Sequence, residues 1–229
     1  MNGEAARSPT SSEVKAALFE EFARLGKALS SARRIELLEL LCNSERSVES
    51  LASLTGMGVT NTSQHLQALK AAHLVEARKE GTRSIYRVAD VEVVDFLYDM
   101  QRLARARLAE ADRIARDYLD ARDELEPVTL EDLLARVERE DVMVIDVRPS
   151  EEYEAAHIPG ALSIPLTALE ARLSELPADV EVVAYCRGPF CVLAPQAVDL
   201  LRAAGVRARR LDGGFPEWRA AGHPVTVGR

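Results

Sequence analysis

In the second half of the chain, short β-type runs alternate with helical runs. The β-type runs cover residues 142–147, 180–185 and 206–211, and helical patterns at residues 169–176 and 193–204 separate them. Strands that alternate with helices form a parallel sheet, because each helix returns the chain to the edge where the previous strand began. The alternation therefore predicts an α/β domain whose parallel sheet is covered by helices.

Length and composition limit the class of protein. A chain of 229 residues is longer than one small domain needs, which favours two domains. The hydrophobic content of 47% and the charged content of 29% are typical of a globular protein. No apolar run is long enough to span a bilayer, and the first residues lack the layout of a signal peptide. Three cysteines, an odd number, favour a reducing compartment, so we expect a cytoplasmic protein without membrane contact.

The first half of the chain has the pattern of a helix-turn-helix. Apolar residues recur at helical spacing over residues 19–41, and a short helix begins at Ser47. Residues 55–58 then form a tight connection, and the next helix runs to about Ala72 with Thr60 as its predicted N-cap. Two short helices joined by a glycine-containing turn are typical of this motif.

A hairpin and a long helix follow. Residues 74–88 change to a β-type period around Gly81, which predicts the wing of a winged helix. Residues 91–122 then show one continuous helical pattern, longer than this domain needs for its own core. We therefore expect a partner helix from a second subunit, and hence a homodimer.

These patterns divide the chain into three segments. We expect a disordered tail over residues 1–16, a mainly α winged helix-turn-helix domain with a β wing over residues 17–123, and the α/β domain over residues 124–229. The charged segment of residues 124–127, which ends in a proline, is the expected boundary.

The second helix of the motif and the wing carry candidate DNA-binding residues. Hydroxyl and amide side chains bond phosphates and base edges, and the first residues of a recognition helix enter the major groove. Residues 70–87 contain five basic and two acidic side chains, so the wing is locally positive although the formal net charge of the chain is −8. A polar, solvated surface is the alternative, but helix, turn and basic wing in this order favour double-stranded DNA. The candidates are Thr60, Asn61, Thr62, Ser63, Gln64, His65, Gln67, Lys70, Arg78, Lys79 and Arg83.

Over about residues 17–120, this half resembles the ArsR-type winged-helix repressors. Residues 51–70, residues 72–75 and the wing at residues 81–86 carry the resemblance. It implies a homodimer, held partly by its first and last helices, that binds a palindromic operator. Two recognition helices then reach successive major grooves about one helical turn apart.

Many members of that family sense metals through paired thiols on the helix before the recognition helix. The matching positions here are Ser47 and Glu49, so that site is absent, and Cys42 stands alone upstream. His65 and His73 are eight residues apart, whereas two ligands on one helix face are usually four apart. We therefore expect neither a metal nor another cofactor.

The cysteine loop, residues 186–191, reads Cys-Arg-Gly-Pro-Phe-Cys and joins a predicted strand to a predicted helix. A thiol in this position faces unpaired backbone N–H groups and the positive end of a helix dipole, which lower its pKa. This setting favours a nucleophile at Cys186 over the alternative, a buried inert thiol. The active-site loop then comprises Arg187, Gly188, Pro189 and Phe190.

Five segments together closely resemble a single-domain rhodanese over about residues 127–227. They are residues 144–148, 157–161, 185–191, 211–218 and 222–225. The resemblance implies a sulfurtransferase fold in which Cys186 attacks the outer sulfur of a donor and becomes a persulfide. The implied donors are thiosulfate, polysulfide and low-molecular-weight persulfides, and Arg187 adds a cation near an anionic donor.

Three residues of these segments also have purely structural interpretations. Asp146 and Arg148 are equally consistent with a structural ion pair, and His157 with the closure of a turn.

Cys191 departs from the usual rhodanese loop, in which a hydroxyl or basic residue is more common. Two thiols five residues apart around a tight loop can approach each other, so Cys191 is a candidate resolving thiol for a persulfide or sulfenic acid on Cys186. The alternative is that Cys191 is the first buried residue of the following helix. The sequence leaves both open.

Together the two halves predict a DNA-binding transcriptional regulator that senses reactive sulfur species through its rhodanese domain. The alternative is a rhodanese-type sulfurtransferase whose N-terminal domain mainly dimerises or localises it. An arsenate or phosphate-type thiol enzyme ranks last, because the cysteine loop is short for wrapping a tetrahedral oxyanion.

Overall fold

The computed structural model describes residues 9–118, 126–139, 141–177 and 179–228, which divide into two compact units. The first unit contains Arg46–Ala89 and the described residues up to Leu38, and the second contains Glu39–Glu45 and the described residues from Asp90 onward. The boundary predicted at residues 123 and 124 lies outside the described residues.

Helix α1, Ser11–Leu29, opens the first unit, and α2, Ala32–Asn43, follows it. The Thr10 hydroxyl accepts a hydrogen bond from the Glu13 backbone N–H at 3.3 Å, and the Glu13 carboxylate accepts one from the Thr10 N–H at 2.6 Å. This capping box starts the helix. The predicted disordered tail is therefore wrong for residues 11–16, and residues 1–8 lie outside the described residues.

Helices α3, Val48–Thr55, and α4, Val59–Ala71, form the predicted helix-turn-helix. Gly56 ends α3 in the left-handed conformation, with φ of 66°. Thr60 is not the N-cap of α4, because Gly58 already has the extended N-cap conformation and Val59 is helical. The inward side chains include Leu51, Leu66 and Leu69, which expose none of their surface.

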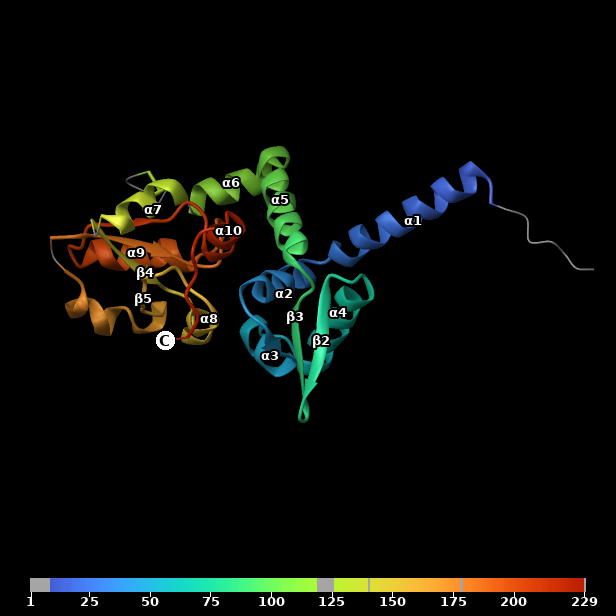
Figure 1. Ribbon diagram of the computed structural model, residues 1–229, viewed down its shortest axis with the longest axis horizontal. Coiled ribbons are helices and arrows are strands. Elements are labelled where there is room, and N and C mark those ends of the chain that lie inside the picture. Colours follow the sequence, from blue (N-terminus) through green and yellow to red (C-terminus); the bar gives the residue numbers. More distant parts are fainter. Residues whose placement is uncertain (1–8, 119–125, 140, 178, 229) are drawn as a thin grey trace, which may run out of the picture. The chain divides into compact units, whose positions relative to one another are not determined.

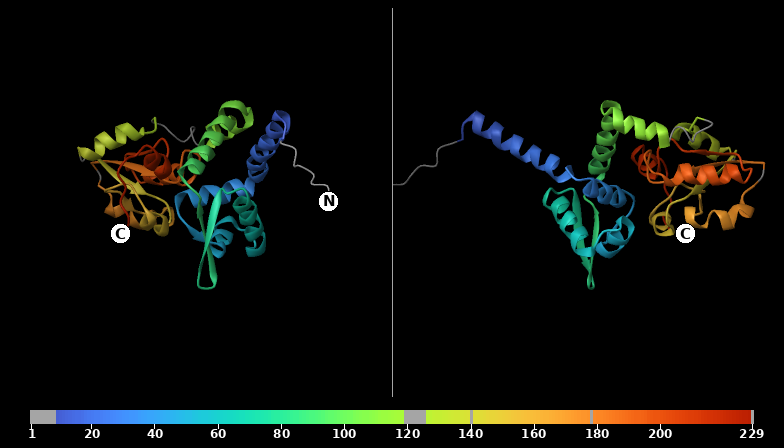
Figure 2. Two further views of the ribbon diagram at one scale, coloured as in Figure 1. Left: turned by 45° about the vertical axis from the view of Figure 1, so that its right-hand side comes forward. Right: turned by 180° about the vertical axis from the view of Figure 1, so that it is seen from behind.

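The predicted wing is confirmed as an antiparallel hairpin of β2, Val75–Glu80, and β3, Arg83–Val88. Figure 2 shows the tip of this hairpin extending beyond α3 and α4 of the same unit. A short strand that the sequence did not reveal, β1 at Arg46–Ser47, pairs with the other edge of β3. The sheet order is therefore β1-β3-β2.

The helical pattern after the wing divides into two helices, α5 at Val91–Arg107 and α6 at Ala109–Tyr118. Leu108 between them is extended, with φ of −106° and ψ of 105°. Its carbonyl accepts a hydrogen bond from the Asp112 N–H at 3.1 Å, which starts α6. The prediction of one continuous helix is therefore wrong at Leu108, and residues 119–122 of that prediction lie outside the described residues.

The second unit contains the predicted parallel sheet, in the order β5-β4-β6-β7 (Figure 1). Its strands are β4, Val142–Asp146; β5, Leu162–Ser163; β6, Glu181–Tyr185; and β7, Ala208–Arg210. Val128 extends the sheet beyond β7 through a parallel bridge to Leu211.

Helical elements cover both faces of this sheet. On one face, α9 at Leu193–Ala203 packs on β4 and β6 through a buried cluster that includes Val198 and Leu201. On the other face, α7 at Leu130–Glu138 and α10 at Phe215–Ala220 contribute Leu133 and Trp218. Because both faces are covered, the central strands are apolar apart from Asp146 at the end of β4 and Glu181 at the start of β6.

The connections between the strands are shorter helical elements. They are α8, Ser150–Ala155, and the 3-10 turns η2, Leu166–Ala168, and η3, Glu170–Glu175. The helix predicted over residues 169–176 is thus mostly a 3-10 segment. In the part of the chain that the structure describes, no helix combines the length and apolar character needed to span a membrane.

Candidate functional site

The structure places both thiols of the cysteine loop in one buried turn between β6 and α9. The Cys191 N–H donates to the Gly188 carbonyl at 3.1 Å, and the Phe215 N–H of α10 donates to the Cys186 carbonyl at 3.0 Å. Cys186 is 1% exposed and Cys191 is 8% exposed. The Cys186 Sγ lies 3.7 Å from the Cys191 carbonyl oxygen, so the loop holds the two cysteines side by side.

Backbone N–H groups act on the pKa values of both thiols. Those of Ala194 and Gly188 favour a thiolate at Cys186, and those of Leu193 and Arg187 favour one at Cys191. The sequence predicted this role for the N–H groups of the loop.

The two thiols differ in acidity. Burial, reinforced by the neighbouring Cys191, raises the pKa of Cys186 well above its ordinary value, and the N–H groups offset only part of that rise. A hydrogen bond from the Cys186 thiol lowers the pKa of Cys191. The pair therefore loses its first proton from Cys191, while Cys186 donates to the resulting thiolate. The expected lowering of the Cys186 pKa is wrong for this resting geometry, because burial outweighs the N–H groups.

Two glycines permit the close packing around the loop. Gly188 has φ of 156°, and a Cβ atom added there would lie 3.0 Å from the Tyr98 ring. A Cβ atom on Gly214 would lie 2.3 Å from the Gly188 nitrogen and 2.5 Å from the Cys186 carbonyl oxygen. No real Cβ atom approaches so closely, so the segment before α10 can pack against the loop only with glycine at position 214.

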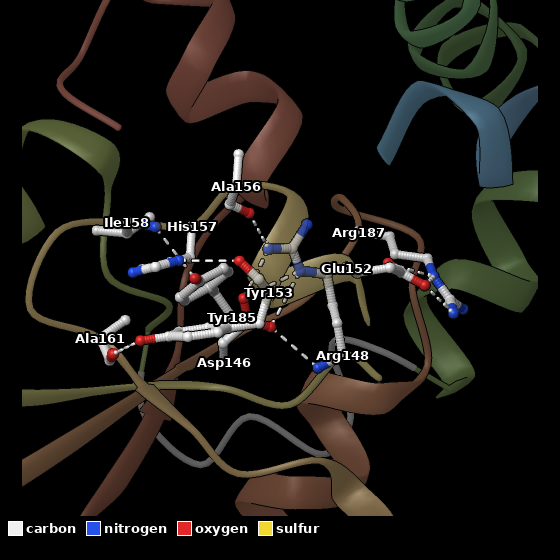
Figure 3. Close-up of polar contacts among 10 residues, drawn as sticks. All are labelled: Asp146, Arg148, Glu152, Tyr153, Ala156, His157, Ile158, Ala161, Tyr185 and Arg187. Atoms are coloured by element: carbon white, nitrogen blue, oxygen red, sulfur yellow. Dashed lines mark hydrogen bonds and ion pairs between the residues drawn. The ribbon is translucent and has the colours of Figure 1, made fainter. Parts of the chain in front are cut away.

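Arg187 points from the loop toward α8 and binds Glu152 there (Figure 3). Its Nη2 lies 2.7 Å from Oε1 of Glu152, and its Nε lies 3.1 Å from both carboxylate oxygens. The Glu152 side chain exposes none of its surface. The cation that the sequence placed near an anionic donor is therefore engaged by a carboxylate, which the sequence did not reveal.

Asp146 and Arg148 form an ion pair, and His157 makes a separate hydrogen bond to α8 (Figure 3). Arg148 Nη2 lies 2.6 Å from Oδ2 of Asp146 and donates to the Ala156 carbonyl at 2.8 Å, and both charged side chains are fully buried. His157 Nδ1 lies 2.9 Å from the Tyr153 carbonyl oxygen, and its backbone pairs with that of Thr226. The structure thus contains the ion pair and the closed turn of the structural interpretation.

Glu217 of α10 is a further titratable group close to the loop. Burial raises its pKa from 4.5 to about 7, although the N–H groups of Glu217 and Gly214 at the helix start act in the opposite direction. Its Oε1 would lie 3.5 Å from a Cβ atom on Gly188. Its position in the run Phe-Pro-Glu-Trp gave no signal of this burial.

The candidate DNA-binding residues divide by exposure. Thr62 is fully buried, and its hydroxyl donates to the Gly58 carbonyl at 3.1 Å, so this residue faces the core and not a DNA surface. Ser63 and His65 are half-buried. The exposed candidates are Thr60, Asn61, Gln64, Gln67, Lys70, Arg78, Lys79 and Arg83.

Contacts within the unit engage part of this surface. Gln67 donates to the Tyr86 hydroxyl at 2.8 Å. On the wing, Arg78 forms an ion pair with Glu80 at 2.5 Å.

Among the described residues, no three His, Cys, Asp or Glu side chains gather as a metal site. Cys42 is buried, and burial raises its pKa to about 12. Its carbonyl accepts a hydrogen bond from Arg219 at 3.1 Å.

Two family models match the chain. The model of the bacterial regulatory proteins of the arsR family matches residues 31–77, and the model of the rhodanese-like domain matches residues 129–221. The chain is 48% identical over 217 residues, 95% of each protein, to the HTH-type transcriptional regulator Rv0324 of Mycobacterium tuberculosis. It is 35% identical over 106 residues to a sulfurtransferase of Allochromatium vinosum, covering 46% of this chain and 95% of that protein.

Among solved structures, the chain is similar to the homodimeric winged helix-turn-helix DNA-binding domain, fragment 1–100, of a possible ArsR-family regulator from Mycobacterium bovis. The identity is 45% and the TM-score is 0.40, over 47% of this chain and 94% of that one.

Proposed function

Because the chain belongs to the ArsR family of bacterial transcriptional regulators and carries a rhodanese-like domain, we propose that it senses reactive sulfur species through Cys186. Cys186 accepts sulfane sulfur as a persulfide, and the change alters the affinity of the protein for its DNA operator. The observation that carries this proposal is the pair of buried cysteines that one turn holds together, with the Cys186 Sγ 3.7 Å from the Cys191 carbonyl oxygen.

The sulfur transfer has two balanced steps. In the first, the Cys191 thiolate accepts the Cys186 proton, the Cys186 sulfur attacks the outer sulfur of a hydropersulfide RSSH to form the Cys186 persulfide, and the released RS⁻ takes that proton from Cys191 and leaves as RSH. In the second, the Cys191 thiolate attacks the inner sulfur of that persulfide, forms the Cys186–Cys191 disulfide and releases hydrosulfide. The acidity of Cys191 supports its role as the attacking group of the second step.

We infer that the DNA-binding surface comprises the exposed residues of α4 and the wing. The hydroxyl and amide groups of Thr60, Asn61 and Gln64 lie at the start of α4, the end of a recognition helix that reaches base edges. Lys79 and Arg83 are exposed on the hairpin and suit phosphate contacts.

We also infer a homodimer, because α1 exposes an apolar stripe. Leu18, Phe19 and Phe22 are 51%, 57% and 61% exposed, and Val14 and Leu25 continue the same stripe. Apolar side chains at helical spacing need a partner surface, and we infer that α1 of a second copy provides it.

Operator binding tests the proposed function. DNA fragments selected from a random pool by the reduced protein serve as ligands, and fluorescence anisotropy measures their affinity before and after polysulfide treatment. We expect the affinity of the wild-type protein to change on treatment, and that of Cys186→Ser to stay constant. Equal affinity of the wild-type protein in both states would refute the proposal.

Mass spectrometry of the same samples identifies the modified atom. We expect Cys186 to gain one sulfur atom in Cys191→Ser, and the wild-type protein to end as the Cys186–Cys191 disulfide. Cys42→Ser is the matched control, because Cys42 is a buried thiol outside the loop, and it should behave as the wild-type protein.

The second candidate function is a sulfurtransferase whose first unit mainly dimerises or localises it. The similarity of residues 129–221 to the rhodanese-like domain favours it. It predicts fast thiosulfate:cyanide turnover together with weak, sequence-independent DNA binding. A sulfur-sensing regulator should instead show slow turnover and select a defined DNA site.

A further inference from the structure

Tyr98 of α5 contacts the cysteine loop. Its hydroxyl donates a hydrogen bond to the Arg187 carbonyl at 2.9 Å, and its ring lies where a side chain at Gly188 would be. Burial raises the pKa of Tyr98 well above its ordinary value, so the phenol stays protonated and remains a donor. A residue 89 positions away in the sequence thus binds the centre of the loop.

This hydrogen bond sets the orientation of one peptide group. In a planar trans peptide the carbonyl and the N–H point in opposite directions. The carbonyl of the peptide between Arg187 and Gly188 points toward Tyr98, so its N–H points away from Tyr98. The Gly188 N–H favours the thiolate form of Cys186, and the Cys186 Sγ lies 3.9 Å from the Gly188 carbonyl oxygen. A donor on the carbonyl also polarises the peptide and strengthens the N–H as a donor.

The other carbonyls of this part of the loop are held by backbone groups. The Cys186 carbonyl accepts from the Phe215 N–H, and the Gly188 carbonyl accepts from the Cys191 N–H. The Arg187 carbonyl receives its bond from a side chain of a different element, so its orientation depends on α5.

We propose that Tyr98 is a positioning residue for Cys186. The Tyr98 hydroxyl holds the Gly188 N–H toward the Cys186 sulfur, which receives the sulfane atom. The proposed function enters only in naming Cys186 as the reacting thiol. The role of Tyr98 concerns the anionic form of that sulfur, whether thiolate or persulfide.

Other titratable groups face these two side chains from every element around them. Cys191 and Arg187 act on Cys186 from the loop. Glu217 of α10 and Cys42 and Glu39 of α2 act on Tyr98. Replacing the Tyr98 hydroxyl by hydrogen leaves all these groups in place, so the variant isolates the hydrogen bond.

The test is Tyr98→Phe in the full-length protein, with alkylation of Cys186 by iodoacetamide followed at its own peptide by mass spectrometry across pH. Loss of a donor that acts through one peptide should slow alkylation at pH 7 about threefold to tenfold and move the pH profile to higher pH. Fluorescence of Trp218, the sole tryptophan, reports whether the variant remains folded.

Tyr153→Phe is the matched control, because the Tyr153 hydroxyl also donates to a backbone carbonyl, that of Ala161 at 2.8 Å, away from the cysteine loop. The proposal is overturned if folded Tyr98→Phe keeps the wild-type pH profile of Cys186, or if Tyr153→Phe shifts it equally. A lower stability with an unchanged profile would show a merely structural role and overturn it as well.

Alkylation needs no sulfur donor, so it tests the role of Tyr98 independently of the proposed sulfur-sensing function. A shifted profile without any gain of sulfur at Cys186 would refute the proposed function and leave the role of Tyr98 intact. If Tyr98→Phe takes up sulfur as fast as the wild-type protein and keeps the wild-type pH profile of alkylation, the role of Tyr98 is refuted and the proposed function stands.

Discussion

The carboxyl group of Glu217 makes the stability of the second unit depend on pH. Burial raises its pKa from 4.5 to about 7, so folding favours the protonated form. The stabilising contribution is complete below pH 4.5 and is lost as the pH rises through 7. Well above pH 7 the loss of stability amounts to roughly 3 kcal/mol, because each tenfold change in proton affinity is worth about 1.4 kcal/mol.

Glu217→Gln removes this dependence and keeps the shape of the side chain. We expect the variant to be more stable than the wild-type protein by about 2–3 kcal/mol at pH 8.5, and to lose that advantage at pH 5. Urea unfolding followed by Trp218 fluorescence measures this directly, since the single tryptophan is buried beside Glu217 on α10.

For each protein the free energy of unfolding is measured at pH 5 and at pH 8.5. The informative quantity is how much the difference in this free energy between variant and wild type changes with pH, since other titrating groups contribute equally to both proteins. Glu170→Gln, at an exposed carboxylate of η3, should show no such change. A difference between Glu217→Gln and wild type that stays constant over this pH range would refute the reasoning.

Three further outcomes are expected. Arg148→Met leaves the Asp146 carboxylate buried without its partner and should destabilise the second unit by about 3–5 kcal/mol, measured by the same urea unfolding. Arg83→Ala on the wing should weaken binding to all DNA sequences alike and reduce the salt dependence of log affinity by about 1, measured by anisotropy titrations at several salt concentrations. Phe22→Asp places a charge on the exposed stripe of α1 and should shift the protein toward monomers in sedimentation velocity, whereas an unchanged dimer would place the interface elsewhere.

Much of the fold was predictable because its signals are local. The apolar runs of β4 and β6, and the glycine turn between β2 and β3, depend on neighbouring residues alone. The break at Leu108 was not predictable, because the apolar spacing continues through it and only the backbone conformation changes. Strand β1 has two residues, too few for any period to appear.

The candidate site was predictable only where its residues are adjacent in sequence. Cys186 and Cys191 belong to one loop, and the structure places them together. Glu152 and Tyr98 reach the same loop from α8 and α5, and nothing in their local sequence indicates these contacts. Their identification requires the packing of elements that lie far apart in the chain.

Thr62 illustrates a limit of composition as a guide to function. It belongs to a run of polar residues, but α4 turns its side chain toward the core, where Gly58 accepts its hydrogen bond. A helical period assigns each polar residue to a face only when the start of the helix is known, and the predicted start at Thr60 was displaced.

The depth of Cys186 also has a kinetic consequence. With 1% of its surface exposed, this thiol meets a reagent only while the loop is transiently open. At high reagent concentration the rate of modification then levels off at the rate of opening, and every small reagent reaches the same ceiling. Short chains of sulfur atoms need only a small opening, whereas bulky disulfides need a large one. We therefore expect polysulfides to modify Cys186 faster than bulky disulfides do.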